Sequence, residues 1–153
     1  MPSTAFAPSR ASLADRLELT KPRITVMVVF MSMVGFVMAS PGPLALPRLA
    51  LALVGTALVA SGAAVLNQLI ERGTDAMMLR TRQRPLAAGR VQPAEAVAFG
   101  GLVTFAGLAV LLWGCGALPA LVALVTWASY LFLYTPLKRR TPLATLVGAV
   151  PGA

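Results

Sequence analysis

The chain alternates between long apolar stretches and short polar links. Uncharged apolar residues run approximately over 24–40, 49–70, 96–113 and 118–135, and a further apolar stretch starts near Thr141. Each of the four stretches is close to the ~20 residues that a helix needs to cross about 30 Å of hydrocarbon. Lipid offers the backbone no hydrogen-bond partners, so spans must be helices or a closed barrel, and unbroken apolar runs fit helices. The pattern therefore predicts an all-α fold, a multi-pass transmembrane helical bundle with about four complete spans plus the start of a fifth.

Proline and glycine mark the ends of these spans. Pro41-Gly42-Pro43 predicts a tight turn after the first span, and Gly114-Cys115-Gly116 predicts a very short hairpin between the third and fourth. Pro93 suits the first turn of the third helix. Residues 1–18 are expected to form a short, mostly disordered cytoplasmic tail. Small residues inside the second and third spans predict close helix packing: Gly55, Ala57, Ala60, Ser61, Gly62, Ala63, Ala64, Gly100, Gly101, Ala106 and Gly107.

Composition and charge agree with a membrane protein. Of 153 residues, 58% are hydrophobic and 12% charged, with a net charge of +8, whereas soluble domains carry about 25% charged residues. With Arg48 as the one exception, the basic residues fall on one side of an alternating topology: Arg10, Arg16, Lys21, Arg23, Arg72, Arg80, Arg82, Arg84, Arg90, Lys138, Arg139 and Arg140. This positive-inside pattern predicts a cytoplasmic N-terminus and cytoplasmic loops at 71–93 and 136–141. It argues against a nucleic-acid binder, which needs base-contacting groups on an accessible basic face.

The stretch NQLIERGTDAMMLRTRQRPL, residues 67–86, carries the strongest candidate chemistry. Asn67, Glu71 and Asp75 are spaced by four and so share one stripe of a helix. Two carboxylates at this spacing repel each other, and desolvation near a membrane adds to the cost. A cation between them removes both problems. Three oxygen donors suit Mg²⁺, which takes one or two carboxylates and completes its shell with water and phosphate oxygens.

Arginines follow this stripe directly. Arg80, Arg82 and Arg84 carry a planar fork that matches phosphate, so a diphosphate bridged by Mg²⁺ satisfies both halves of the stretch. In the alternative, the arginines set the topology and touch anionic lipid. The carboxylates then form an interfacial ion-pair cluster with Arg72, Arg80 or Lys138.

A second candidate element lies at the end of the fourth span. The phenol of Tyr134 and the ammonium of Lys138 can both reach a diphosphate oxygen from the same membrane side. Alternatively, Tyr134 is an interface anchor and Lys138 a positive-inside charge. Cys115 stands alone in a chain without histidine, so it predicts neither a metal site nor a nucleophile and is interpreted as a small apolar residue.

These motifs resemble a known family. NQLIERGTDAMMLRTRQRPLAAGRV is similar to the first aspartate-rich motif of the UbiA superfamily of intramembrane prenyltransferases. Its pattern N-x3-E-x3-D-x2-M-x-R-T-x2-R-P-L most resembles the protoheme IX farnesyltransferase (heme O synthase) branch. LTKPRITVM at 19–27 and YTPLKRRTPL at 134–143 agree with that branch. The resemblance implies that residues 19–153 are the N-terminal part of an intramembrane prenyltransferase domain.

The resemblance also implies a reaction and a role for each matched residue. Farnesyl diphosphate ionises with the help of Mg²⁺, and the farnesyl group is transferred to a vinyl group of protoheme IX, a substrate, to give heme O in the bacterial inner membrane. Without histidine, this part of the fold would hold heme by apolar packing and basic residues. The implied ligands of Mg²⁺ are Asn67, Glu71 and Asp75, and the implied diphosphate-binding residues are Arg80, Arg84, Tyr134 and Lys138.

Other functions stay open at this point. The same family includes prenyltransferases that act on an aromatic acid or a quinone precursor. Half of a membrane transporter would place carboxylates near the midplane, in an interrupted helix. A structural subunit would bind no diphosphate. Members of the superfamily are longer than this chain and carry a second aspartate-rich motif, so we expect an N-terminal portion that is inactive alone.

Overall fold

The computed structural model describes residues 11–138, 141 and 144–152, and among these residues it contains helices and no strands. Within this described part of the chain, four helical segments are long and apolar enough to cross a membrane, which confirms the predicted all-α multi-pass fold. The last of them consists of α5, the π-helix η1 and α6. In chain order the elements are α1 (Leu13–Leu19), α2 (Pro22–Ala39), α3 (Leu46–Met77), α4 (Pro93–Cys115), α5 (Ala117–Ala128), η1 (Ser129–Tyr134), α6 (Thr135–Leu137) and α7 (Ala144–Gly152).

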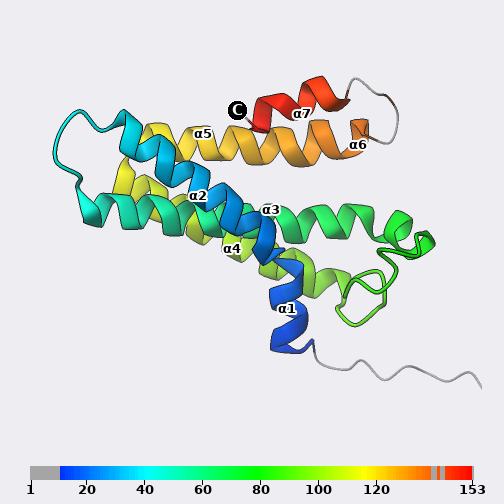
Figure 1. Ribbon diagram of the computed structural model, residues 1–153. Helices are drawn as coiled ribbons and strands as arrows, with labels where there is room; N and C mark the ends of the chain where they lie inside the picture. Colours follow the sequence, from blue (N-terminus) through cyan, green and yellow to red (C-terminus); the bar gives the residue numbers. More distant parts are fainter. Residues whose placement is uncertain (1–10, 139–140, 142–143, 153) are drawn as a thin grey trace, which may run out of the picture.

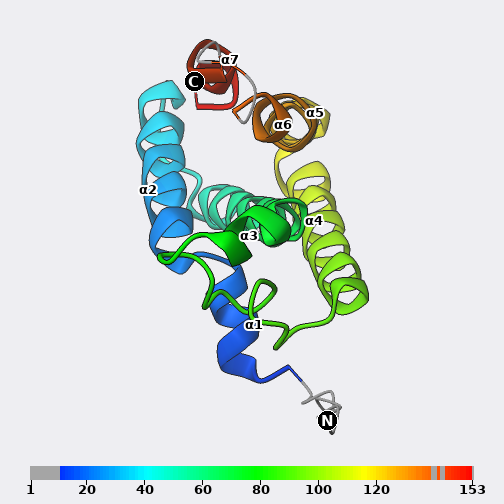
Figure 2. The ribbon, with the colours of Figure 1, turned by 90° about the vertical axis from the view of Figure 1, so that its right-hand side faces the viewer.

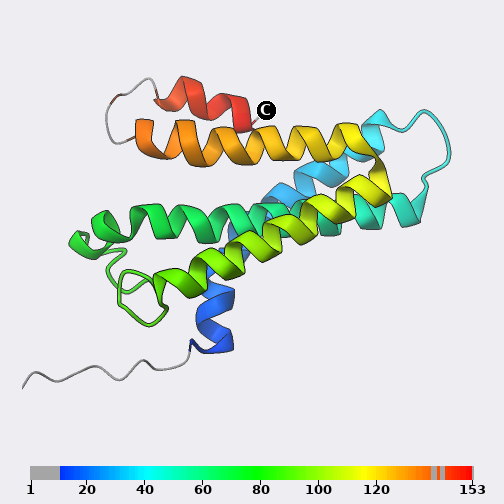
Figure 3. The same cartoon turned by 180° about the vertical axis from the view of Figure 1, so that it is seen from behind.

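Helix α3 lies in the middle of the bundle. Seen along its axis, it has α2 on one side and α4 on the other, with α5, α6 and α7 above (Figure 2). Successive spans run in opposite directions (Figure 1), and α4 crosses the back of α3 as a close antiparallel neighbour (Figure 3). The start of α2, the link 78–92 and the end of α6 therefore meet at one end of the bundle. This end is called the charged end below.

Glycines allow α3 and α4 to approach closely. A Cβ atom at Gly62 would lie 2.8 Å from the carbonyl oxygen of Gly100, and one at Gly107 would lie 2.8 Å from that of Gly55. Such backbone-to-backbone contact confirms the packing role predicted for these four small residues. Gly101 is different, because a Cβ there would meet nothing within 4 Å.

The predicted helix boundaries are largely confirmed. Pro22 and Pro93 are the first residues of α2 and α4, where the missing proline N–H costs no helical hydrogen bond. Gly116 alone joins α4 to α5, with φ at 103°, a conformation that favours glycine. Helix α3 continues beyond the apolar stretch as far as Met77, so the predicted stripe lies on a regular helix.

The expected disordered tail is wrong for its second half, where α1 forms. Ser12 and Asp15 make a reciprocal capping box: the Asp15 N–H donates to Ser12 Oγ at 3.1 Å, and the Ser12 N–H donates to Asp15 Oδ2 at 3.2 Å. This box satisfies N–H groups that an uncapped helix start leaves unpaired. Residues 1–10 of the tail, and Arg139 and Arg140 of the basic loop, lie outside the described residues.

A small apolar core fixes the charged end. The Gln68 side-chain amide donates to the carbonyl oxygen of Leu19 at 3.1 Å, so the end of α1 is tied to α3. The same core buries one end of the link 78–92. Its fully buried members are Leu19, Val65, Leu86, Val91 and Ala96.

Candidate functional site

A cavity of about 720 Å³ opens at the charged end of the bundle. Its walls come from the start of α2, the end of α3, the link 78–92 and the last turns of the fourth span. Seven residues predicted from the sequence are among those that line it. The full lining is Lys21, Asn67, Glu71, Thr74, Asp75, Met78, Arg80, Thr81, Arg84, Tyr130, Tyr134 and Lys138.

The stripe of oxygen donors forms one wall of this cavity. Asn67, Glu71 and Asp75 all lie on α3, and their exposed fractions are 1%, 8% and 6%. Four residues advance a helix by slightly more than one turn, so the three side chains follow each other along one face. The predicted shared face is therefore confirmed, and two buried carboxylates stand at the end of a membrane-spanning helix.

Hydrogen bonds fix the side chains of Asn67 and Glu71. The Asn67 side-chain amide donates to Glu71 Oε2 at 2.8 Å. The Thr135 hydroxyl, from α6, donates to the Asn67 side-chain oxygen at 2.8 Å. These two hydrogen bonds link the fourth span to α3 through a buried polar network. Each of its three side chains has a hydrogen-bond partner, which such networks require.

Each carboxylate is also paired with a cation. Lys138 Nζ forms an ion pair with Glu71 Oε1, and Arg84 Nη1 lies 2.8 Å from Asp75 Oδ2. The pairing of Glu71 with Lys138 was one of the alternatives that the sequence left open. Asp75 takes Arg84 as its partner among the described residues, in place of the suggested Arg72 or Arg80. Pairing offsets the cost of holding the two carboxylates away from water.

The link 78–92 brings two of its arginines, Arg80 and Arg84, to the cavity. Thr81 is buried, and its hydroxyl donates to the backbone carbonyl of Asp75 at 3.0 Å. Leu86 anchors the following turn in the apolar core. Arg84 is thereby directed to Asp75, while Arg80 is exposed and lines the mouth of the cavity.

The fourth span changes to a π-helix where it meets the cavity. The rings of Tyr130 and Tyr134 stack with centroids 5.6 Å apart and an interplanar angle of 19°, and both rings line the cavity. Lys138 Nζ lies 5.5 Å from the centroid of the Tyr134 ring. Short π-helical turns are frequent at functional sites, because they redirect side chains within an otherwise regular helix.

Sequence reasoning gave no role to five lining residues and to Thr135, which supports Asn67. The five are Lys21, Thr74, Met78, Thr81 and Tyr130. Lys21 had a signal, because it lies in the stretch LTKPRITVM. In the structure it precedes α2, and its side chain lines the cavity. Burial lowers the pKa of the Lys21 ammonium, and the positive charge of Arg84 lowers this pKa further. Thr135 had the same kind of signal, because it lies in YTPLKRRTPL, whereas Tyr130 gave none, since a π-helix is not visible in a residue pattern.

The donor set fits a hard divalent ion that brings its own oxygen ligands. Within the described ranges, no group of three or more His, Cys, Asp or Glu residues could hold a metal. The candidate oxygen ligands at this cavity are the carboxylates of Glu71 and Asp75 and the side-chain amide of Asn67. Mg²⁺ is bound in this way when phosphate and water complete its octahedron. If the ion were bound there, Glu71 and Asp75 would hold it in place of their ion pairs with Lys138 and Arg84, and these two cations would be free for phosphate oxygens.

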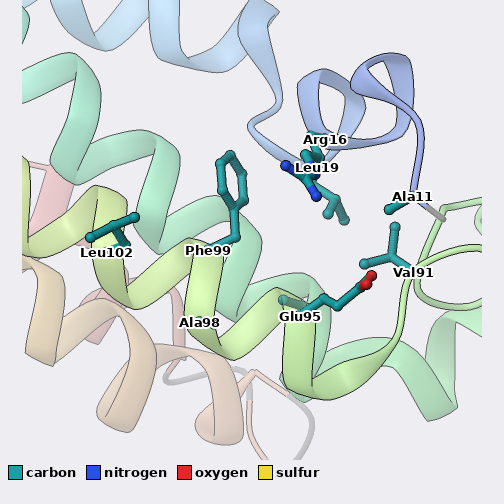
Figure 4. A pocket seen from close by; sticks show the side chains of 9 residues that line it. Ala11, Arg16, Leu19, Val91, Glu95, Ala98, Phe99 and Leu102 are labelled. Atoms are coloured by element: carbon teal, nitrogen blue, oxygen red, sulfur yellow. The ribbon is translucent and has the colours of Figure 1, made fainter.

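A second, smaller cavity of about 300 Å³ lies between α1 and α4. Its side chains are mostly apolar, with Leu19, Phe99 and Leu102 among them (Figure 4). Of the residues that line it, only Arg16 and Glu95 are charged, and none belongs to the predicted site. The candidate chemistry therefore concentrates in the larger cavity.

Fold and site together define a class: a multi-pass helical membrane protein with buried carboxylates and surplus cations around one cavity. The sequence profile of the UbiA prenyltransferase family matches residues 28–153, and the chain belongs to this family. The chain is thus a member of a prenyltransferase family, as its motifs predict.

The chain is similar to curated proteins that are named protoheme IX farnesyltransferases. The chain is 44% identical over 150 residues to a protoheme IX farnesyltransferase of Solibacter usitatus (92% of this chain, 51% of the relative). It is 44% identical over 155 residues to one from Anaeromyxobacter sp. (99% and 52%). It is 52% identical over 106 residues to one from Sorangium cellulosum (69% and 38%). The chain spans about half the length of the curated relatives it matches. No solved structure matches it.

Proposed function

We propose that the protein transfers a farnesyl group from farnesyl diphosphate to a vinyl group of protoheme IX. The observation that carries this proposal is one cavity in which two buried carboxylates, Glu71 and Asp75, lie among four cations, two more than their ion pairs use. A family of prenyltransferases needs a site that holds a diphosphate, and this arrangement supplies charges of both signs at one place. The names of the similar curated proteins support protoheme IX as the acceptor.

Each residue of the site has a physical task in this proposal. Mg²⁺, when bound to oxygens of the α3 stripe, supplies positive charge to the leaving diphosphate. Arg80, Arg84 and Lys138 neutralise the remaining phosphate oxygens, and the Tyr134 phenol donates a hydrogen bond to one of them. Stabilising the charge that develops on the leaving group lowers the barrier to breaking the allylic C–O bond. The electron pair of that bond leaves with the diphosphate.

The farnesyl group then becomes an electrophile for the acceptor. The π electrons of a heme vinyl group form the new C–C bond, and the oxygen of a water molecule adds to the resulting cation with loss of a proton. The product is a hydroxyethylfarnesyl porphyrin, heme O. This part of the proposal rests on the likeness to the protoheme IX farnesyltransferases. The stacked Tyr130 and Tyr134 rings would form an aromatic part of the cavity wall.

The charged end is proposed to face the cytoplasm of a bacterial cell, with the chain in the inner membrane. Apart from Arg48, the basic residues of the described chain lie on α1, at the start of α2, in the last turns of α3, in the link 78–92 and after α6. The positive-inside rule supports this orientation. A cysteine introduced at Arg82, with the native Cys115 replaced by alanine, should react with a membrane-impermeant maleimide only in inverted vesicles. Labelling of that cysteine in intact cells would show that the charged end faces the opposite side of the membrane.

Product analysis tests the proposed reaction. The full-length protein in lipid nanodiscs is incubated with farnesyl diphosphate and protoheme IX, with and without Mg²⁺, and the porphyrins are analysed by mass spectrometry. We expect a product that carries one farnesyl group and one water, formed with Mg²⁺ and lost in Glu71→Gln. Glu95→Gln is the matched control, because Glu95 is exposed and lies outside the cavity. A parallel incubation offers 4-hydroxybenzoate as the acceptor, and prenylation of this compound but not of protoheme IX would show that the proposed acceptor is wrong. Absence of diphosphate release with both acceptors would contradict the proposed reaction.

The transporter alternative finds little support in the geometry. Its carboxylates would lie near the middle of a broken helix. Instead, α3 is continuous from Leu46 to Met77, and Glu71 and Asp75 lie in its last turns beside the arginine-bearing link. Their position at one end of the span fits a substrate that is bound from one side of the membrane.

A further inference from the structure

The charges around the large cavity do not balance. Its lining contains four cations, Lys21, Arg80, Arg84 and Lys138, and two carboxylates. Two of the cations are taken up by the ion pairs to Glu71 and Asp75. The side chain of Arg80 is exposed to solvent, whereas Lys21 is partly buried, and no ion pair of the described residues includes it.

An unusual backbone conformation places Lys21 at the cavity. Its φ and ψ are 48° and 62°, and it is the only non-glycine residue with positive φ within the described ranges. The following Pro22 disfavours the right-handed helical conformation for Lys21. A left-handed conformation is costly for a residue with a side chain, and such strain concentrates at functional sites.

Contacts on both sides hold this turn in place. Before it, Leu19 is 1% exposed, and its carbonyl accepts from Gln68 of α3. After it, the Thr25 hydroxyl donates to the carbonyl of Thr20 at 3.0 Å. The turn therefore cannot relax without breaking buried contacts, and the Lys21 side chain stays directed at the cavity.

We propose that Lys21 binds an oxyanion of the substrate diphosphate, as a fourth cation of the site beside Arg80, Arg84 and Lys138. This inference rests on the proposed function and adds a residue to it. A partly buried ammonium without a carboxylate partner is compensated best by an anion that enters with the substrate. Lys21 lines the same cavity as Arg84 and Lys138, so a diphosphate bound there lies within reach of all three cations.

Diphosphate binding to variants of the full-length protein in nanodiscs tests this proposal. Inorganic diphosphate and farnesyl diphosphate are titrated, in the presence of Mg²⁺, into wild type, Lys21→Gln, Lys21→Gly and Lys21→Arg. We expect Lys21→Gln and Lys21→Gly to weaken binding about tenfold to a hundredfold, the usual worth of a hydrogen bond to a charged group. Lys21→Arg should recover most of the affinity. The glycine variant removes the ammonium while it relieves the backbone strain, so it keeps the turn foldable.

Arg23→Gln is the matched control, because it removes one charge from the exposed side of the same helix start and leaves the cavity lining unchanged. Binding by Lys21→Gln that equals that of Arg23→Gln would overturn the Lys21 proposal alone. The Lys21 proposal would also be overturned if, in the prenyl transfer assay, the variants raised only the KM for protoheme IX. That result would assign Lys21 to a heme propionate. Wild type that binds neither diphosphate would overturn the proposed function together with this inference.

Discussion

The hydroxyl of Thr135 donates to the side-chain oxygen of Asn67 at 2.8 Å, and the two residues are 0% and 1% exposed. They lie 68 positions apart in the sequence, on the fourth span and on α3. The contact fixes the end of the fourth span, with Tyr134 and Lys138, against the carboxylate stripe. Two motifs that are separate in the sequence thus form one site because a threonine and an asparagine satisfy each other in the interior.

Thr135→Val should therefore weaken both the fold and the site. Valine keeps the volume but leaves the Asn67 oxygen buried without its donor, which costs about 1–3 kcal/mol. Thr135→Ser keeps the hydroxyl and should retain most of the stability. Thermal unfolding in detergent gives the stability, and titration with farnesyl diphosphate gives the affinity. Equal behaviour of the valine and serine variants would mean that the hydrogen bond does not organise the site.

Substituting Gly62 should separate α3 from α4. A Cβ at this position would meet the backbone of α4 at the Gly100 carbonyl, 2.8 Å away, and backbone cannot move aside as a flexible side chain can. Gly62→Leu should cost at least the 1–3 kcal/mol typical of overpacking, at the order-of-magnitude level. Gly101→Ala is the control on the neighbouring helix and should change stability by less than about 0.5 kcal/mol. Similar melting temperatures for the two variants would contradict the close-packed interface.

Arg84 and Arg82 should differ sharply although both carry the same charge in the same link. Arg84 reaches Asp75 and lines the cavity, whereas Arg82 is exposed and does not line it. Arg84→Gln should weaken farnesyl diphosphate binding about tenfold or more, since a hydrogen bond to a charged group is lost, and Arg82→Gln should change it less than twofold. Equal effects would favour arginines that act only through topology and anionic lipid.

The attachment of α1 to the link 78–92 should depend on pH. Arg90 Nε lies 2.8 Å from Asp15 Oδ1, and Arg90 Nη2 lies 3.2 Å from Glu18 Oε2. The hydrogen bond from the Ser12 hydroxyl, together with Arg90, holds the pKa of Asp15 below its ordinary value of 3.8. A carboxyl with a lowered pKa contributes stability above its unfolded pKa and loses it as the pH falls through its folded pKa.

Amide exchange of α1 measures this dependence. Protection of residues 13–19 should be constant near neutral pH and should fall below about pH 4, relative to α4. Asp15→Asn should show reduced protection at neutral pH and a flatter profile, because its side chain does not titrate. A wild-type profile that matches that of Asp15→Asn would show that the carboxylate does not hold α1.

Particular residues show how far the sequence alone could lead. The apolar runs located the four spans, since crossing hydrocarbon leaves few alternatives to a long apolar helix. The spacing of Asn67, Glu71 and Asp75 placed them on one face, because residues four positions apart lie on the same side of a helix. The glycines of α3 and α4 likewise predicted a close interface.

What the sequence did not predict depends on tertiary contacts. The choice of Arg84 as partner of Asp75 follows from the buried Thr81 and Leu86, which set the path of the link. The left-handed turn at Lys21 depends on Gln68 of α3. Helix α1 is a different case, because its cap is local: residues 1–18 were expected to be mostly disordered, whereas Ser12 and Asp15 cap a helix there.

Mg²⁺-dependent binding of farnesyl diphosphate tests the central claim most directly. Calorimetric titrations of the full-length protein in nanodiscs compare wild type, Asp75→Asn and the control Glu95→Gln, each with and without Mg²⁺. Wild type and Glu95→Gln should bind at least about tenfold more tightly with Mg²⁺, and Asp75→Asn should lose most of this gain, because the stripe then keeps one carboxylate for the ion. Binding that is independent of Mg²⁺ and unchanged in Asp75→Asn would contradict a site in which the α3 carboxylates hold a metal-bridged diphosphate.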